Sequence, residues 1–190
     1  QSEGDSLYVP LSHIGSGGAQ HANATTTTSG FMSGADKTKL DGLTSDVVLI
    51  TTANLTSLSN TVLTNISELS INVQAGKTYI FEALLRFQTA ATTTGISLAM
   101  GGTSTGEVVA NVNTLLGSGT AGLFTGPLTS LSTSIVTSTS VPAANTKYLA
   151  RITGIFVATT TGTIFPQFRS EVNGSLVTIF NSSTMVYKEI

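Results

Sequence analysis

Apolar residues recur at every second position over residues 78–89, and this is the clearest pattern in the chain. Every second residue of the run is apolar, whereas the intervening positions include Glu82, Arg86 and Gln88. Side chains of a β-strand point alternately to its two faces, so the run predicts a long strand with one buried face. Residues 147–160 repeat the pattern with small and apolar residues at every second position.

Shorter runs of β-branched and aromatic residues predict more strands in the rest of the C-terminal part. These lie at residues 47–51, 66–73, 95–100, 107–116, 128–141, 163–172, 175–180 and 185–190. Asn173-Gly174 predicts a tight hairpin turn of the type that needs positive φ at both positions. No helical pattern follows residue 46. The expected fold class is all-β, a jelly-roll-like antiparallel sandwich over residues 47–190.

One short helix is predicted in the N-terminal part, over residues 34–41. Ser33 can cap it, Asp36 places an acid in its first turn, and Gly42 can end it. A helix this short is not stable alone in water, because its first turn costs more than its few hydrogen bonds return. The apolar residues that need burial around it are Phe31, Met32, Leu40 and Leu43. Residues 1–46 offer little else to pack against, so we expect the partner to be another copy of the segment or the neighbouring domain.

The amino-acid sequence of this segment resembles a stretch of the fibre and spike proteins of tailed bacteriophages. The matching pieces are His-Ile-Gly-Ser-Gly-Gly-Ala-Gln-His-Ala (residues 13–22), Ala-Thr (24–25), Gly-Phe-Met-Ser (30–33), Asp-Lys (36–37) and Lys-Leu-Asp-Gly (39–42). They cover roughly the first quarter of the chain. The resemblance implies a homotrimeric virion fibre with a β-rich C-terminal knob, and residues 1–46 as its extended stalk and attachment region.

Composition adds an argument for assembly. Of the 190 residues only 9% are charged, the net charge is −2 and the mean hydropathy is +0.29. Glu107 is the only charged residue between Ala90 and Thr146. So uncharged a surface favours an obligate oligomer, in which neighbouring subunits cover part of each chain. A neutral surface rich in serine and threonine is the simpler alternative.

The same composition excludes several classes of protein. Scattered Lys and Arg argue against a nucleic-acid partner, which needs clustered positive charge. No apolar run reaches the 18 or more residues of a membrane-spanning helix, so membrane insertion is not expected. The chain has no cysteine, which excludes a disulfide scaffold and a thiolate metal site. We expect no cofactor.

His13 and His21 are the only histidines and the only candidates for a metal site. On a three-fold axis either would appear three times and could bind an ion, but no second type of ligand lies nearby, so a hydrogen bond from each imidazole to the backbone of a neighbouring chain is the favoured reading. A glycan-cleaving enzyme would need paired carboxylates. The candidates, Glu68, Glu82, Glu107 and Glu171, are far apart in sequence. We therefore expect no catalytic residues and no enzyme.

Residues 117–127 are predicted to form a glycine-rich loop that carries Leu123 and Phe124. Loops on a rigid sandwich commonly recognise other molecules, so these two residues are candidates for receptor contact. The alternative is that Phe124 lies in the trimer interface.

These observations indicate a structural protein of a phage virion. The leading interpretation is a homotrimeric tail fibre or spike, anchored to other virion proteins by its N-terminal arm, whose knob binds the host surface, with surface glycan as the expected receptor. The main alternative is a head fibre or a cement protein that decorates the capsid. A glycan-degrading tailspike and a cellular trimeric adhesin or C1q-like domain are the remaining alternatives.

Overall fold

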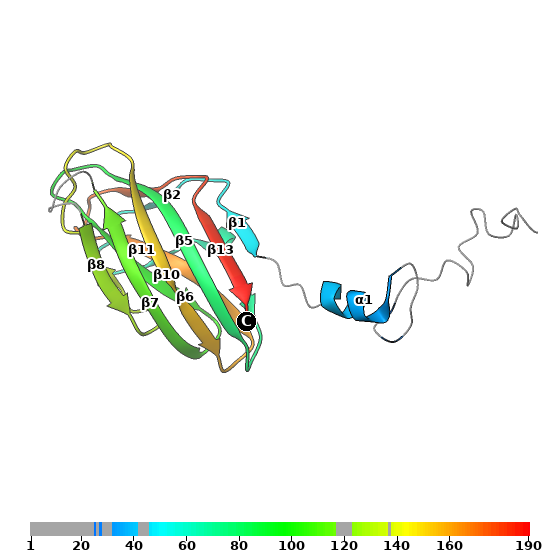
Figure 1. Cartoon of the computed structure of the whole chain (residues 1–190). Coiled ribbons are helices and arrows are strands. Elements are labelled where there is room, and N and C mark those ends of the chain that lie inside the picture. The colour runs from blue at the N-terminus through cyan, green and yellow to red at the C-terminus, as the bar shows by residue number, and fades with distance from the viewer. Residues whose placement is uncertain (1–24, 26, 28–31, 42–45, 117–122, 137) are drawn as a thin grey trace, which may run out of the picture. The chain divides into compact units, whose positions relative to one another are not determined.

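The computed structural model describes residues 25, 27, 32–41, 46–116, 123–136 and 138–190 (Figure 1). By its internal contacts the chain divides into two units, residues 1–45 and 46–190. The first contains the helix and the second contains all of the described strands.

Helix α1 spans Gly34–Asp41, the predicted residues. The Ser33 hydroxyl accepts a hydrogen bond from the Asp36 backbone N–H at 3.1 Å and donates one to the Asp36 carboxylate at 2.7 Å. This caps the first turn, although the carboxylate binds the hydroxyl and not the Ser33 backbone N–H of a standard capping box. An ion pair between Lys37 and Asp41 links the next turn. No residue of α1 is buried.

Residues 46–190 form an antiparallel β-sandwich, which confirms the predicted fold class. Its strands are β1 (Val47–Ile50), β2 (Leu55–Ser57), β3 (Thr64–Asn65), β4 (Ile71–Val73), β5 (Thr78–Thr89), β6 (Ile96–Gly102), β7 (Gly106–Leu115), β8 (Leu123–Leu128), β9 (Ile135–Val136), β10 (Tyr148–Ala158), β11 (Gly162–Ser170), β12 (Val177–Ile179) and β13 (Thr184–Glu189). The large sheet has eight strands in the order β1-β13-β5-β10-β7-β8, with β12 beside β5 and β2 beside β12. The small sheet has five, in the order β3-β11-β6-β9, with β4 also on β11.

The two strands with the clearest sequence patterns lie next to each other in the middle of the large sheet (Figure 1). Strand β5 has its predicted bounds, and β10 pairs with it in register from Tyr148–Phe87 to Val157–Thr78. The predicted inward residues of β5 are all buried and pack in one core with Phe168 and Leu98 of the small sheet. Both sheets therefore contribute to a single hydrophobic core, as a sandwich requires.

Most connections cross from one sheet to the other. Strands β5, β6 and β7 alternate between the large and small sheets, and so do β10, β11 and β12. The β7–β8 hairpin stays within the large sheet. Strands β12 and β13 follow one another along the same edge of β5.

The strand predicted at residues 66–73 is confirmed only for its last part, where β4 pairs with β11. The part before it contains a short 3₁₀ helix, Ser67–Leu69, and the preceding Thr64–Asn65 pairs as β3. Ile66, Leu69, Ile71 and Val73 are all buried. The single turn of 3₁₀ helix turns Ile66 and Leu69 into the core together, which an unbroken strand could not do because their spacing is odd.

The hairpin predicted at Asn173-Gly174 is also wrong. Only Gly174 has positive φ, at 78°, and the Ser175 backbone N–H donates to the Val172 carbonyl. This is the geometry of a turn with glycine at its third position. The strands on either side, β11 and β12, belong to different sheets, so the turn carries the chain across the sandwich.

Residues 128–141 were predicted as a strand or strand pair, but only β9 at Ile135–Val136 is regular. The turn predicted at residues 101–106 begins later, because Gly101 and Gly102 still belong to β6. A Cβ at Gly102 would lie 2.0 Å from the Thr163 carbonyl oxygen of β11. Glycine at this position therefore allows close strand pairing and does not mark a turn.

Candidate binding surface on the large sheet

The side of the large sheet that faces away from the core exposes a row of branched aliphatic side chains. Val109 of β7, Ile155 of β10 and Ile80 of β5 are direct neighbours across the three strands. Their exposed fractions are 56%, 45% and 39%. Val157, Val48 and Ile50 are further exposed apolar residues on this face. Single exposed apolar residues are common, but a contiguous group on a sheet face is typical of an interaction surface. We call it the outer apolar face.

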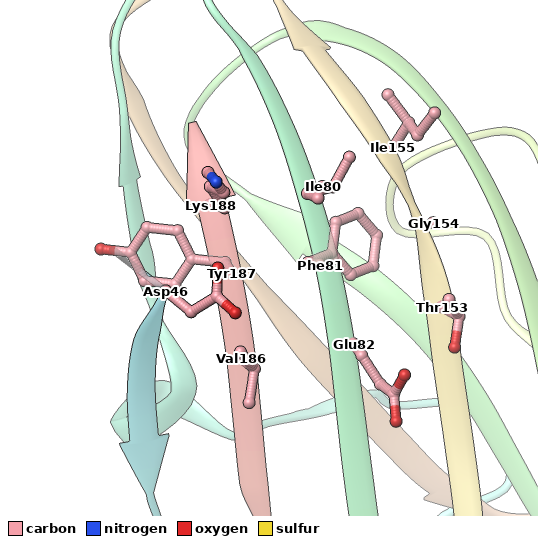
Figure 2. Close-up of a pocket in the computed structure, with 10 residues that line it drawn as sticks. All are labelled: Asp46, Ile80, Phe81, Glu82, Thr153, Gly154, Ile155, Val186, Tyr187 and Lys188. Carbon is pink, nitrogen blue, oxygen red and sulfur yellow. The ribbon is translucent and has the colours of Figure 1, made fainter. Parts of the chain in front are cut away.

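A shallow hollow of about 520 Å³ opens on this face between β13, β5 and β10 (Figure 2). Its lining residues are Asp46, Ile80, Phe81, Glu82, Thr153, Gly154, Ile155, Val186, Tyr187 and Lys188. Glu82 forms an ion pair with Arg151 on the neighbouring strand at 2.5 Å. The central charges of the face thus neutralise each other within one chain, and the remaining lining is mainly apolar.

Two charged residues stand at opposite edges of the outer apolar face. Lys188 of β13 lies opposite Ile80 and extends the row on that side. Val109 is at the other end of the same row. Glu107 of β7 is exposed and lies two residues from Val109. Within the part of the chain that the structure describes, neither side chain takes part in a hydrogen bond or an ion pair. In particular, Lys188 forms no ion pair with Asp46. One edge of the face therefore carries the carboxylate of Glu107, and the other carries the amino group of Lys188, which lines the hollow together with Asp46.

A third charged group holds the last strand of the sandwich. The Glu189 carboxylate accepts hydrogen bonds from Lys77 Nζ at 2.6 Å and from the Tyr79 hydroxyl at 3.2 Å. The hydrogen bond from Lys77 lowers the pKa of Glu189, and the same contact raises the pKa of Lys77. Burial raises the pKa of the Tyr79 hydroxyl. The Glu68 carboxylate similarly accepts hydrogen bonds from the Thr52 hydroxyl and backbone N–H, which lower its pKa.

We expect the Lys77–Glu189 pair to make the stability of the sandwich depend on pH in the acid range. Since the folded-state pKa of Glu189 lies below its ordinary value of 4.5, its contribution is present above that value and is lost as the pH falls through the folded-state pKa. The free energy of unfolding, measured with urea at about pH 6 and about pH 3, should therefore fall less between the two pH values for Glu189→Gln than for the native chain. Glu171→Gln is the control, and an equal effect of both substitutions would contradict this role.

The helix residues predicted to contact other subunits are exposed in the single chain. Met32 has an exposed fraction of 39% and Leu40 of 52%. Phe31 and Leu43, the other two predicted contacts, lie outside the described residues, as do His13 and His21. Among the described residues no group of three or more His, Cys, Asp or Glu side chains could hold a metal ion.

The predicted recognition loop is shorter than expected. Leu123 and Phe124 are not at a loop tip, because their backbone belongs to β8 and pairs with Leu115 and Thr114 of β7. Pro127 also lies in β8, where the missing N–H is tolerated since β8 ends the sheet. The β-branched and aromatic content of residues 123–128 is low, so this segment is only weakly predicted as a strand.

The carboxylates proposed for glycan cleavage do not form a pair on the large sheet. Glu82 lies opposite Thr153 and Glu107 opposite Val157, four residues further along β10. That offset alone is about 13 Å, which exceeds the roughly 5–9.5 Å between the two acids of glycoside hydrolases. Glu68 lies in the 3₁₀ helix and binds Thr52.

The sequence analysis missed the outer apolar face, although its signal was present. Residues 78–89 were assigned a polar outer face from Glu82, Arg86 and Gln88, but Ile80 and Leu84 occupy the same face. Odd-numbered positions of β10 likewise include Leu149, Ile155 and Val157. Branched aliphatic residues at positions that alternate outward were the available sign.

Comparison with known proteins identifies no family. No protein-family model and no curated protein matches the chain. Among solved structures, the VP2 subviral particle of infectious bursal disease virus matches with a TM-score of 0.25 and 13% identity, over 78% of this chain and 42% of VP2. VP2 of the Gt strain of that virus matches with a TM-score of 0.23 and 13% identity, with the same coverage. This chain thus spans less than half of the VP2 chains, and so distant a likeness carries no argument about function. No described helix is long and apolar enough to cross a membrane.

Proposed function

We propose that the chain is a structural, non-enzymatic protein of a tailed-bacteriophage virion, a homotrimeric fibre or spike. Its first 46 residues form the stalk and attachment region, and its sandwich is a knob that contacts the host surface. The sequence resemblance of residues 13–42 to phage fibre and spike proteins supports the virion assignment. The observation that carries the trimer is helix α1, which is capped at its N-terminus by Ser33 but buries none of its residues.

An eight-residue helix of this kind requires a partner. Isolated helices shorter than about 12–15 residues are marginal in water, and most helical stability in proteins comes from packing of an apolar face. In α1 and its flank, Met32 and Leu40 are available for such packing and remain exposed in the single chain. Three copies of the segment would bury these side chains against one another.

The knob would bind a receptor on the host surface, with glycan as the proposed class. The alternative location is the capsid, where the same trimer would act as a head fibre or cement protein. Labelled antibody against this chain, applied to intact virions, distinguishes the two. Label at the tail tip is expected. Label spread over the head would contradict the tail fibre and support the head fibre or cement protein.

Replacing both Met32 and Leu40 with aspartate should weaken the trimer and leave the sandwich folded. Three copies would then place six carboxylates in the proposed contact, where mutual repulsion and loss of apolar burial both oppose association. Light scattering should show a lower mass at micromolar concentration, with unchanged β-sheet circular dichroism.

The matched control is Lys39→Ser, which changes a largely exposed side chain in the same helix. It should keep the native mass. If the aspartate variant also keeps the native mass and melting temperature, the helix has no part in assembly and the proposed stalk contact is wrong.

A further inference from the structure

We propose that the sandwiches of neighbouring copies meet through one end of the outer apolar face. The β7 edge of each copy would contact the β13 edge of the next, around a three-fold axis parallel to the strands. This inference rests on the proposed trimer. It adds a second contact surface, between the sandwiches (residues 46–190) of two copies, to the one proposed for the arm.

The large sheet is open on both sides at this end. Pairing of β8 with β7 stops at Ala110, and pairing of β1 with β13 stops at Tyr187. Beyond these positions the sheet is four strands wide, in the order β7-β10-β5-β13, and no other strand of the described chain pairs along its two edges. Free sheet edges with unpaired backbone groups are usually protected by charge or covered by another element. We call this part, Gly106–Val109 of β7 with Lys188–Ile190, the open end.

The centre of the open end is mainly apolar. The row Val109–Ile155–Ile80 crosses three strands, and in the neighbouring row Thr78 lies between Val157 and Ile190. Ile190 is 64% exposed. Burial of apolar surface stabilises association by about 25 cal/mol per Å², so this area favours contact with another surface that also carries few charges.

The charges at the two edges indicate that the other surface is a second copy. Glu107 marks the β7 edge and Lys188 marks the β13 edge, and neither has a charged partner among the described residues of its own chain. Around a three-fold axis the left edge of each sheet meets the right edge of the next, so each Glu107 would approach a neighbour's Lys188. Glu107 and Lys188 belong to neighbouring rows, which are two residues apart along the strands. Long side chains can span such a diagonal. Every copy would then satisfy both charges.

Cysteine cross-linking of the full-length chain tests this arrangement directly, because the native sequence contains no cysteine. Val109→Cys and Lys188→Cys are combined in one chain, since these residues end the same row. Three strand spacings separate them within a copy, about 14 Å, which is too far for an internal disulfide. The purified protein is treated with a mild oxidant and, separately, with a short bis-maleimide. Denaturing gels and light scattering are run on the same samples.

The proposal predicts covalent trimers from the double variant and no cross-linked species from either single variant. It also predicts that adding Ile155→Asp lowers the cross-linked fraction roughly ten-fold, because a carboxylate would be buried at the contact. The control Val62→Asp, at an exposed loop position away from this face, should not change the cross-linked fraction.

Three outcomes would overturn the proposal. A trimeric mass without cross-links shows that copies associate elsewhere, and the proposed trimer survives while this interface fails. Covalent dimers alone show a two-fold contact between the faces. A monomeric mass without cross-links removes both this interface and the trimer of the proposed function.

Discussion

Replacing Phe87 with alanine should lower the free energy of unfolding of the sandwich by about 3–5 kcal/mol. Phe87 is fully buried in β5, and its ring centroid lies 5.8 Å from that of Tyr148 on the paired strand β10. On its other side Phe87 pairs with Ile179 of β12. The substitution would leave a cavity at the point where three strands meet, and the surrounding sheet cannot collapse to fill it.

Thermal unfolding of the full chain measures this effect, at equal protein concentration because oligomers melt at concentration-dependent temperatures. A loss of this size corresponds to a drop of about 10–15 °C in Tm. Phe180→Ala is the matched control, since Phe180 is only half-buried and its ring lies under Lys147 at 4.7 Å. Equal losses from both substitutions would contradict the central place given to Phe87.

Replacing Gly154 with valine should destabilise the sandwich by about 3 kcal/mol. Gly154 is an inward-facing position of β10, between β5 and β7. A Cβ there would lie 2.4 Å from the Ala110 Cβ and 2.6 Å from the Val109 carbonyl oxygen. Because one of these atoms is backbone in the middle of a sheet, the clash can be relieved only by moving β7 away from β10.

Thr153→Val is the control on the adjacent residue of the same strand. The Thr153 hydroxyl is buried without a hydrogen-bond partner among the described residues, so replacing it by a methyl group removes an unsatisfied polar atom. Urea titration of both variants measures the difference, and we expect unchanged or slightly higher stability for Thr153→Val. If Gly154→Val is tolerated equally well, the close packing of β10 on β7 is not important for stability.

The sequence predicted the centre of the sandwich well because a single physical rule determines it. In β5 and β10 one face packs on the core along most of the strand, so apolar or small residues recur at every second position and approximate bounds follow from them. The helix was equally accessible, since Ser33 and Asp36 cap it through contacts within four residues of chain. Local and strictly periodic signals were sufficient in both cases.

The remaining features depend on contacts distant in the sequence. Ile66 and Leu69 enter the core through a 3₁₀ turn whose position is fixed by a hydrogen bond from the Ile66 N–H to the Pro166 carbonyl. Strand β8 is placed by its pairing with β7, which its own composition hardly indicates. The outer apolar face became visible only when the register aligned Val109, Ile155 and Ile80. No single strand contains that row.

The arm and the sandwich both lead to the same expectation from different residues. Helix α1 exposes Met32 and Leu40, and the sandwich exposes an apolar row with an acidic and a basic edge. Each feature lacks a partner in the described part of a single chain, and the proposed association of identical chains would supply one for both.

The mass of the 190-residue chain in solution tests this central claim most directly. Light scattering coupled to size-exclusion chromatography, at micromolar concentration, should give about three times the chain mass of 19.5 kDa. A mass of 19.5 kDa that stays constant as the concentration rises would contradict the account.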